Sequence, residues 1–299
     1  MSDLLRPLPD PAYDTVLVPL DGTAFADGAV PIASSLAARF GATVHVVAVA
    51  SAGDDADGRR ARAADALGAG PGAPTVHVEV DGDVAGAVVR VAGTLGRCLV
   101  CMAGHGRGRL DGALVSSVPR DVIERSHQPV VVAGPAAVAQ GQYASLLPGE
   151  PGADRLIACV DGTAASEQAL PAAAAWAHAL GMTMTILTVA EPSPPPLHDG
   201  DEWRRHHGPQ CDADGYIGAL AARWSDASPG VEGVAVYDPI SPALGLRDYL
   251  TRHPAGLVVV SGHARTGADR LLFSATTAEI IHRCAAPVVV VPTDPRTSD

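Results

Sequence analysis

The fold is decided by a stretch that occurs twice in the chain, as TVLVPLDGTAFADGAVPIASSLAARFGATVHVVAVA (15–50) and as RLIACVDGTAASEQALPAAAAWAHALGMTMTILTVA (155–190). The two stretches align without a gap at an offset of 140 residues, from Asp21 to Asp161. A second pair, CLVCMAGHGRGRLDGALVSSVPRDVIERSHQPVVVAGP (98–135) and GLVVVSGHARTGADRLLFSATTAEIIHRCAAPVVVVP (256–292), aligns at an offset of 158, from His105 to His263. Self-similarity of this kind predicts two copies of one domain, called copy one and copy two below.

Copy one alternates short apolar strands with helices. Residues 15–20 are a run of β-forming residues, and the helical spacing of Ala and Leu that follows ends at Gly41. The other predicted strands are 43–49, 76–80, 98–102 and 130–133, and the predicted helices are 26–40, 57–67, 84–95 and 118–126.

Copy two repeats this order with clearer helix starts. Ser241 before Pro242 predicts an N-cap followed by Pro at the first helical position. Thr276 and Glu279 have the spacing of a capping box. Strands that alternate with helices pair in parallel through right-handed crossovers. The predicted fold class is therefore α/β, with two tandem doubly wound (Rossmann-like) domains, each with a five-stranded parallel sheet flanked by helices.

The alignment also predicts the domain boundaries, which are 1–135 for copy one and 154–299 for copy two. Residues 136–153 between them are rich in Pro, Gly and small side chains and are predicted to be a linker. The second offset exceeds the first by 18 residues (158 − 140), which places an insertion in copy two at about 191–215. The insertion contains the metal-ligand types His198, His206, His207, Cys211, Asp212 and Asp214. Their spacing matches no zinc pattern, so we expect an exposed loop without a metal.

Charge and composition exclude several function classes. A net charge of −12 argues against general affinity for nucleic acid or anionic membrane. No run reaches the ~18–20 apolar residues of a membrane span, and residues 1–14 lack the apolar core of a signal peptide. We expect a soluble, cytoplasmic protein that binds neither nucleic acid nor membrane. Cys98 and Cys101 form C-x-x-C, but residues three apart on a strand point to opposite faces, so we expect two core cysteines.

The loops that follow the first and fourth strands have the chemistry of a ligand site. In an open parallel sheet a ligand lies beyond the carboxyl ends of the strands, where the strand order reverses. Asp21 after the first strand offers a carboxylate to ribose hydroxyls or to an adenine amino group. The loop from Ala103 to Arg109 after the fourth strand offers glycine backbone N–H groups and positive charge to phosphate oxygens. The alternative is that Asp-Gly is an ordinary turn, but the two signals recur together in both copies.

These motifs make the chain similar to the universal stress protein family, and specifically to its tandem-domain members. The resemblance covers nearly the whole chain. It rests on the opening V-P-x-D-G-[ST] at 18–23, the Gly-His-Gly-Arg-Gly loop at 104–108 and the Pro-Val-Val-Val strand that closes each half. In ATP-binding members the loop after the fourth strand reads G-x-x-G, nine residues, then G-[ST]. The first strand supplies an Asp near the adenosine, and a Val ends the second strand. By position, these roles fall on Asp21 and Val49, and on Asp161 and Val189.

The loop departs from the family pattern in both copies. In copy one, Ala103 replaces the first Gly, Gly106 is kept, and Ser116-Ser117 replaces Gly-Ser. In copy two, Ser261 and Ala264 replace both glycines, and Ser274-Ala275 replaces the last pair. A Cβ where the backbone must approach a phosphate costs about 1 kcal/mol or more. We therefore expect ATP or a related adenine nucleotide in copy one more than in copy two.

The resemblance and the loop chemistry together give one set of expected nucleotide-binding residues. In copy one it comprises Pro19, Leu20, Asp21, Gly22, Val49, Met102, Ala103, Gly104, His105, Gly106, Arg107, Gly108, Ser116, Ser117 and Val118. In copy two it comprises Asp161, Gly162, Val189, Ser261, Gly262, His263, Arg265, Gly267 and Ser274.

Three functions compete on this evidence. The preferred one is a non-enzymatic stress-response module that binds or senses an adenine nucleotide. A slow ATPase would need a metal-holding acid and a residue that orients water, and the sequence contains neither Walker motif. The third is a scaffold or interaction protein without a ligand.

The last strand of each copy predicts how the copies assemble. Residues 130–133 and 288–291 are apolar edge strands that need to be covered. We expect them to pair with each other in an intramolecular pseudo-dimer, or with another chain in a homodimer.

Overall fold

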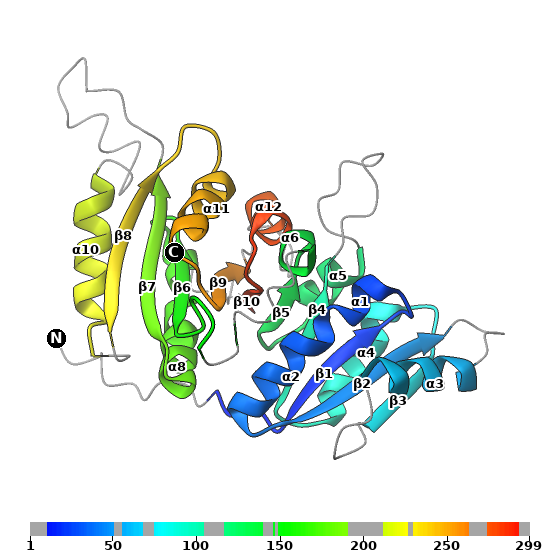
Figure 1. Cartoon of the computed structure of the whole chain (residues 1–299). Coiled ribbons are helices and arrows are strands. Elements are labelled where there is room, and N and C mark those ends of the chain that lie inside the picture. Colours follow the sequence, from blue (N-terminus) through cyan, green and yellow to red (C-terminus); the bar gives the residue numbers. More distant parts are fainter. Residues whose placement is uncertain are drawn as a thin grey trace.

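The structure is a computed structural model in which the two copies lie side by side (Figure 1). It describes residues 11–50, 56–67, 75–104, 117–139, 146, 149–190, 212–226, 230–262 and 274–292.

Copy one forms the alternating strands and helices that its sequence predicts. Its strands are β1 (Thr15–Leu20), β2 (Thr43–Ala50), β3 (Thr75–Val80), β4 (Cys98–Ala103) and β5 (Val130–Ala133). Its helices are α1 (Ala24–Asp27), α2 (Ala29–Phe40), α3 (Ala56–Leu67), α4 (Val84–Thr94) and α5 (Ser117–Arg125). A short helix, α6 (Pro135–Ala139), follows β5 at the start of the segment predicted as a linker.

Copy two repeats the pattern. Its strands are β6 (Arg155–Val160), β7 (Thr183–Ala190), β8 (Val231–Tyr237), β9 (Leu257–Gly262) and β10 (Val288–Pro292). Its helices are α7 (Ala164–Glu167), α8 (Leu170–Leu180), α10 (Ala213–Arg223), α11 (Pro242–Arg252) and α12 (Ala275–Arg283).

The described strands form one sheet of ten, in the order β3-β2-β1-β4-β5-β10-β9-β6-β7-β8. All pairs within a copy are parallel, which confirms the predicted doubly wound fold. At the centre β5 pairs with β10 in antiparallel orientation, and Val131 lies opposite Val289. This pairing confirms the predicted pseudo-dimer. Because the strands of the two copies run in opposite directions, the edge of the sheet at which the strands of copy one end is the edge at which the strands of copy two begin.

Helices cover both faces of the sheet and produce two core layers. Val16 and Val18 of β1 pack in the layer that includes Ile32 of α2 and Trp176 of α8. Leu17 packs in the other layer, with side chains of α4, α5, α11 and α12. Cys98 and Cys101 lie in opposite layers, as the alternation along a strand requires. Burial raises the pKa of both thiols to about 12.

The structure corrects two predicted helix starts. The helix predicted over 26–40 is two helices, because the Thr23 side chain accepts a hydrogen bond from Ala26 N and starts α1 earlier, and α2 then begins after Gly28. The capping box at Thr276 and Glu279 is wrong, because Ser274 already caps α12 by accepting from Thr277 N at 3.0 Å. The predicted cap at Ser241 is confirmed, with Leu244 N as its donor and Pro242 in the first turn.

Most of the predicted insertion, residues 191–211, lies outside the described residues, and with it His198, His206, His207 and Cys211. Asp212 caps α10 by accepting from Gly215 N, and Asp214 accepts from the Tyr237 hydroxyl. In the described ranges no three His, Cys, Asp or Glu side chains are grouped as a metal ion requires. None of the described helices is both long enough and apolar enough to span a membrane.

Arg39 joins the copies at the end of α2. Its guanidinium donates to Ala153 O at 3.1 Å and to Leu146 O at 3.4 Å, and it also donates to Leu180 O at the end of α8. Burial lowers the pKa of Arg39, although the side chain remains the donor for all three carbonyls. A cation at the last turn of a helix is also favoured by the helix dipole.

Arg39→Ala is therefore expected to lower the free energy of unfolding by about 2 kcal/mol, because partly buried carbonyl groups lose their donor. Urea denaturation measures the change. The control is Arg252→Ala, which removes an exposed arginine near the end of α11 and is expected to stay within about 0.5 kcal/mol of the parent. Equal losses in the two variants would contradict the role given to Arg39.

Candidate functional site

The candidate site of copy one lies where β1 and β4 separate. β1 pairs with β2 along its whole length, up to Leu20 opposite Ala48. The described pairing of β1 with β4 covers only Thr15–Leu17. Strand order reverses at this pair, since β1 leads to β2 on one side and β4 to β5 on the other. Asp21 follows β1 and Gly104 follows β4, so the two residues stand at the ends of neighbouring strands, as predicted.

The turn after β1 is built around the Asp21 carboxylate. Its Oδ1 accepts from Thr23 N at 2.9 Å and from Thr23 Oγ1 at 2.6 Å. Gly22 has φ +82°, a backbone conformation that glycine adopts without strain. Asp21 therefore stabilises the turn, which is the role it has in the alternative interpretation of Asp-Gly as an ordinary turn. Among the described residues, none donates a hydrogen bond to its second oxygen, which remains able to accept from a ligand.

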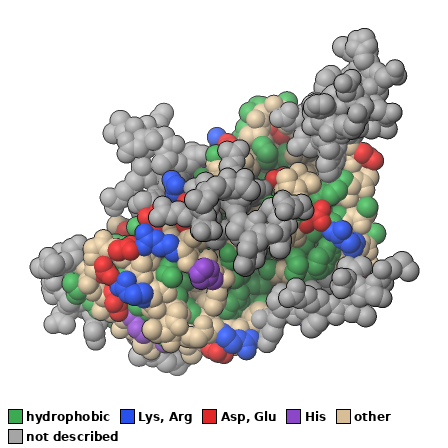
Figure 2. Space-filling model, turned by 180° about the vertical axis from the view of Figure 1, so that it is seen from behind, with side chains coloured by type: hydrophobic (Ala, Val, Ile, Leu, Met, Phe, Trp, Pro, Cys, Tyr) green, Lys and Arg blue, Asp and Glu red, His purple; other side chains and the backbone are tan. Residues whose placement is uncertain are grey.

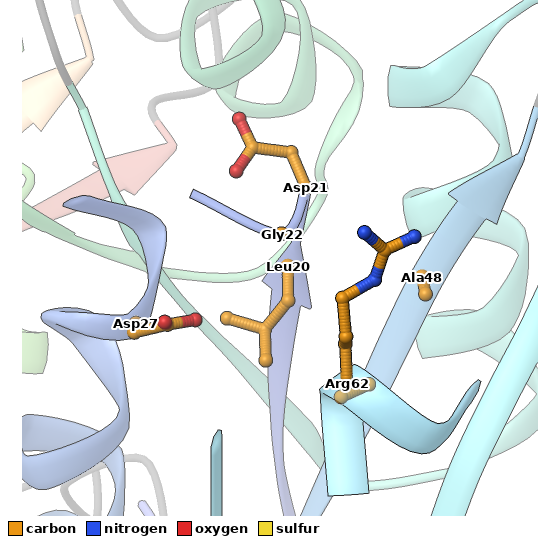
Figure 3. Close-up of a pocket in the computed structure, with 7 residues that line it drawn as sticks. Leu20, Asp21, Gly22, Asp27, Ala48 and Arg62 are labelled. Carbon is orange, nitrogen blue, oxygen red and sulfur yellow. The ribbon is translucent and has the colours of Figure 1, made fainter. Parts of the chain in front are cut away.

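A cavity of about 140 Å³ opens beside this turn. Figure 3 shows Asp27 of α1 and Arg62 of α3 on opposite sides of Leu20, with the guanidinium of Arg62 extending past Ala48 toward the turn. The volume is close to that of an engineered cavity of about 150 Å³ that holds benzene, so it suits one ring of a ligand. The residues that line the cavity are Leu20, Asp21, Gly22, Asp27, Ala48, Arg62 and Ala63.

The wall of the cavity is acidic on the side of α1. The pKa of Asp27 is raised, first by burial and then by the negative charge of Asp21. A phosphate placed between these two carboxylates would be repelled, whereas hydroxyl or amino groups would find acceptors. Arg62 is the one basic residue among the described residues of the lining, and its Nε donates to Gly58 O at 3.3 Å. A planar guanidinium of this kind can stack on an aromatic base.

Asp27, Ala48 and Arg62 were not among the residues that the sequence predicted. Ala48 could have been predicted from the sequence. It lies opposite Leu20 on the neighbouring strand, and because side chains alternate along a strand, the two side chains point to the same face of the sheet. The same alternation puts Val49 on the other face of β2, against the second core layer and away from the cavity. Asp27 and Arg62 carried no such signal, since a charged residue in a helix is usually only solvated.

Other predicted residues of copy one have structural roles. Gly104 N donates to Ala133 O at 2.8 Å, and a Cβ at Gly104 would lie 2.7 Å from Val132 Cγ1, so packing against β5 already explains this glycine. Met102 and Val118 pack in the second core layer. Ala103 packs against the first, and Pro19 lies within β1 opposite Val47. Ser117 is the first residue of α5.

Copy two has the same turn. Asp161 Oδ1 accepts from Thr163 N at 3.0 Å and from Thr163 Oγ1 at 2.6 Å, and Gly162 has φ +84°. Ser261 and Gly262 end β9 and are buried, and Ser274 caps α12. The side chain of Val189 packs against the second core layer, as that of Val49 does in copy one.

Beside this turn, copy two carries a tyrosine. The Tyr216 hydroxyl of α10 donates to Glu167 Oε1 at 3.0 Å, and Arg223 Nη2 lies 2.5 Å from Glu167 Oε2. Glu167 is the counterpart of Asp27 at the offset of 140. The pKa of Tyr216 is raised by burial and then by the charge of Glu167, with a smaller contribution from the charge of Asp161. The counterpart of the cavity residue Asp27 is therefore already hydrogen-bonded within copy two.

The remaining predicted residues fall outside the part of the chain that the structure describes. They are His105, Gly106, Arg107, Gly108, Ser116, His263, Arg265 and Gly267.

Comparisons with known proteins agree with this architecture. The model of the universal stress protein family matches residues 12–134 and 152–292. A crystal structure of a putative universal stress protein from Pseudomonas aeruginosa UCBPP-PA14 is 14% identical, covers 95% of both chains and has a TM-score of 0.63. A universal stress protein from Archaeoglobus fulgidus DSM 4304 is 16% identical and covers 93% of this chain and 98% of its own, with a TM-score of 0.58.

A third structure, of a universal stress protein in complex with cAMP, is 22% identical and covers 47% of this chain and 98% of its own, with a TM-score of 0.37. Among curated proteins, no match was found.

Proposed function

The chain belongs to the universal stress protein family, and on this basis we propose that copy one binds an adenine nucleotide of the ATP type as a non-enzymatic, cytoplasmic stress-response module. The observation that carries the proposal is the cavity beside Asp21, at the point where the strand order reverses. In open α/β sheets this is where ligands bind.

The charges of the site suggest how the nucleotide lies in it. One uncharged ring of the nucleoside suits the cavity, because Asp21 and Asp27 accept hydrogen bonds from hydroxyl and amino groups. The phosphates then lie outside the cavity, away from the two carboxylates. The N-terminus of α5 is at the same edge of the sheet, and a helix N-terminus favours an anion.

Copy two is proposed to be the structural half of the pair. Tyr216, Glu167 and Arg223 already satisfy one another next to Asp161. A nucleotide that used Glu167, the counterpart of Asp27, would have to compete with the hydrogen bond that Tyr216 donates to it, which costs about 1 kcal/mol or more. This asymmetry supports one nucleotide per chain.

The Asp21 carboxylate provides a test with an internal control. Asp21→Ala is expected to weaken ATP binding at least about 10-fold, because it removes an acceptor for the ligand. Asp161→Ala breaks the same two turn hydrogen bonds in copy two and is expected to leave ATP binding unchanged. Isothermal titration calorimetry measures both. Equal losses would show that the turn matters only for folding, and no loss in either would remove Asp21 from the site.

The non-enzymatic part of the proposal is supported by the absence of either Walker motif from the sequence. Steady-state phosphate release from ATP tests it. Turnover above roughly 1 per second, within the ordinary range for enzymes, would contradict it.

A ligand-free scaffold is the second candidate, and the continuous sheet through β5 and β10 favours it. Such a protein needs no open cleft. It predicts that neither copy binds ATP, so the same titration separates the two functions.

A further inference from the structure

Two histidines face each other across strands β2 and β3 of copy one. Each belongs to the same short sequence, TVHV, at 43–46 and at 75–78. The register places His77 opposite Val47, so that it lies diagonally across from His45. His45 Nδ1 is 3.1 Å from His77 Nε2, and the ring centroids are 5.3 Å apart. The two imidazoles are therefore within hydrogen-bonding distance of each other.

A hydrogen bond between two imidazoles limits how many protons the pair can hold. In the neutral pair, one ring donates its N–H and the other accepts with its unprotonated nitrogen. A first added proton binds the outer nitrogen of the donor ring and leaves the hydrogen bond in place. A second has only the accepting nitrogen to bind, and two positively charged N–H groups then face each other. The pair therefore tolerates one positive charge but not two.

The pair lies on the face of the sheet that α4 covers. Val47 and Val49 of β2 pack in the second core layer with side chains of α4, and His45 shares their face because side chains alternate along a strand. α3 covers the opposite face, where Ala63 belongs to the first core layer. Both histidines are half-buried. Burial, and then the charge of His77, lowers the pKa of His45.

The elements packed around the pair offer little to balance a second positive charge. The one charged side chain of α4 is Arg90, which pairs with Asp81, and β1 contributes the apolar Leu17. On β3, Glu79 shares the face of the pair and is a single carboxylate for two imidazolium charges. Figure 2, which views the molecule from behind, shows Arg side chains beside Asp and Glu side chains over copy one, at the left, with His side chains among them.

Acid therefore acts against the pairing of β2 and β3. The pKa of His45 is lower in the folded protein than its ordinary value of about 6.5, so the unfolded chain takes up this proton first as the pH falls. The contribution of the pair to stability is complete above about pH 6.5 and is lost as the pH drops below that value. The loss falls on β3, an edge strand whose one neighbour among the described strands is β2.

Copy two has a different pair of residues at this place. The counterpart of His45 at the offset of 140 is Thr185, whose hydroxyl donates to Glu232 of β8 at 2.8 Å. At the place of His77, β8 has Val234. Neither a threonine hydroxyl nor an ordinary glutamate titrates between about pH 5 and pH 8. Sensitivity to mild acid at this position is therefore a property of copy one.

Copy one is also the copy with the open cleft, and β3 supports one wall of that cleft. α3 packs against both β2 and β3. Arg62 and Ala63 of α3 line the cavity beside Asp21, and Ala48, three residues after His45, lines it from β2. If β3 separates from β2, α3 loses one of the two strands that hold it, and its wall of the cavity is no longer fixed.

We propose that the His45–His77 pair is a pH switch, in which a second proton releases β3 from β2 and thereby weakens ligand binding in the cleft of copy one. The release follows from the geometry of the pair. Its effect on ligand binding rests on the proposed nucleotide function. Copy one then gives up its nucleotide when its surroundings become acidic.

Hydrogen exchange of the full chain in buffer with EDTA, followed by mass spectrometry, tests the release without a nucleotide. From about pH 7.5 to about pH 5, the protection factor of the β3 amides is expected to fall at least about 10-fold in the parent, the effect of one pKa unit. In His45→Gln and in His77→Gln, whose new side chains stay neutral, it is expected to fall less than about 3-fold. The β8 amides of the other edge strand are the internal control.

His127→Gln is the matched control variant, because His127 is exposed and lies outside the pair. It is expected to lose protection in β3 as the parent does. Thermal unfolding at about pH 7.5 checks that each variant folds, and either variant of the pair is sufficient for the test. Equal losses of β3 protection in the parent and in the variants of the pair would overturn the switch, as would a loss in β8 as large as that in β3.

Titration calorimetry with ATP tests the effect on the cleft. From about pH 7.5 to about pH 5, the parent is expected to lose at least about 5-fold more affinity for ATP than His45→Gln loses. Protonation of ATP and of Asp27 is common to both proteins and cancels in this comparison. Equal losses would overturn the effect of the switch on the cleft. No ATP binding by the parent at about pH 7.5 would refute the proposed function and this effect, while hydrogen exchange still decides the release of β3.

Discussion

Val131→Glu is expected to lower the free energy of unfolding by about 4 kcal/mol or more, because it places an unpaired carboxylate in the middle of the sheet. Val131 is 0% exposed and lies opposite Val289, which is 1% exposed. Both side chains belong to the core layer that continues from copy one into copy two. A buried charge without a partner is among the most destabilising of single substitutions. Urea denaturation followed by circular dichroism measures the loss.

The control for this variant is Val80→Glu. Val80 is also a strand valine, at the end of edge strand β3, but it is 63% exposed. Its replacement is expected to change stability by less than about 0.5 kcal/mol. If Val131→Glu unfolds at the same urea concentration as Val80→Glu, the antiparallel junction of β5 and β10 does not exist as described.

Gly134→Ala is the second substitution with a large expected effect. Gly134 follows β5 and is buried against α12 of the other copy. A Cβ there would overlap the Ile281 carbonyl oxygen and lie 2.7 Å from its carbon, and a helix backbone has no flexible end that could move aside. The two copies would have to shift apart, so we expect a loss of about 3 kcal/mol or more.

Gly93→Ala is the matched control. Gly93 lies within α4, and a Cβ there would meet nothing within 4 Å. Alanine is the better helix former, so this variant is expected to gain about 0.5–1 kcal/mol. Thermal unfolding of the two variants thus tests the junction with the same chemical change. A stabilised Gly134→Ala variant would mean that the copies do not pack closely at Ile281.

The sequence predicted the architecture well because its signals were local and repeated. Apolar runs bounded by Gly or Asp marked the strands, and the recurrence of residues 15–50 at 155–190 fixed the duplication. Pairing of the last strands followed from the need to cover the apolar edges at Val131 and Val289. Helix starts were predicted less well. Thr276 has the right spacing for a cap, but Ser274 comes first along the chain and caps the helix.

The candidate site was predicted only in part, because a cavity depends on contacts between segments far apart in the sequence. Asp21 and Gly22 could be found from the turn after β1. Arg62 could not, because its place beside Ala48 depends on how α3 packs over β2. From the changed glycines of the loop, the sequence predicts weaker nucleotide binding in copy two than in copy one. Tyr216 and Glu167 add a second reason for it, which no motif of the loop contains.

The central proposal for this protein is one open nucleotide cleft in a duplicated fold. Native mass spectrometry of the full chain with added ATP tests it most directly. We predict a single ATP adduct per chain, which persists in Asp161→Ala and is lost in Asp21→Ala. No adduct, two adducts of equal strength, or a single adduct that Asp161→Ala removes and Asp21→Ala does not would contradict it.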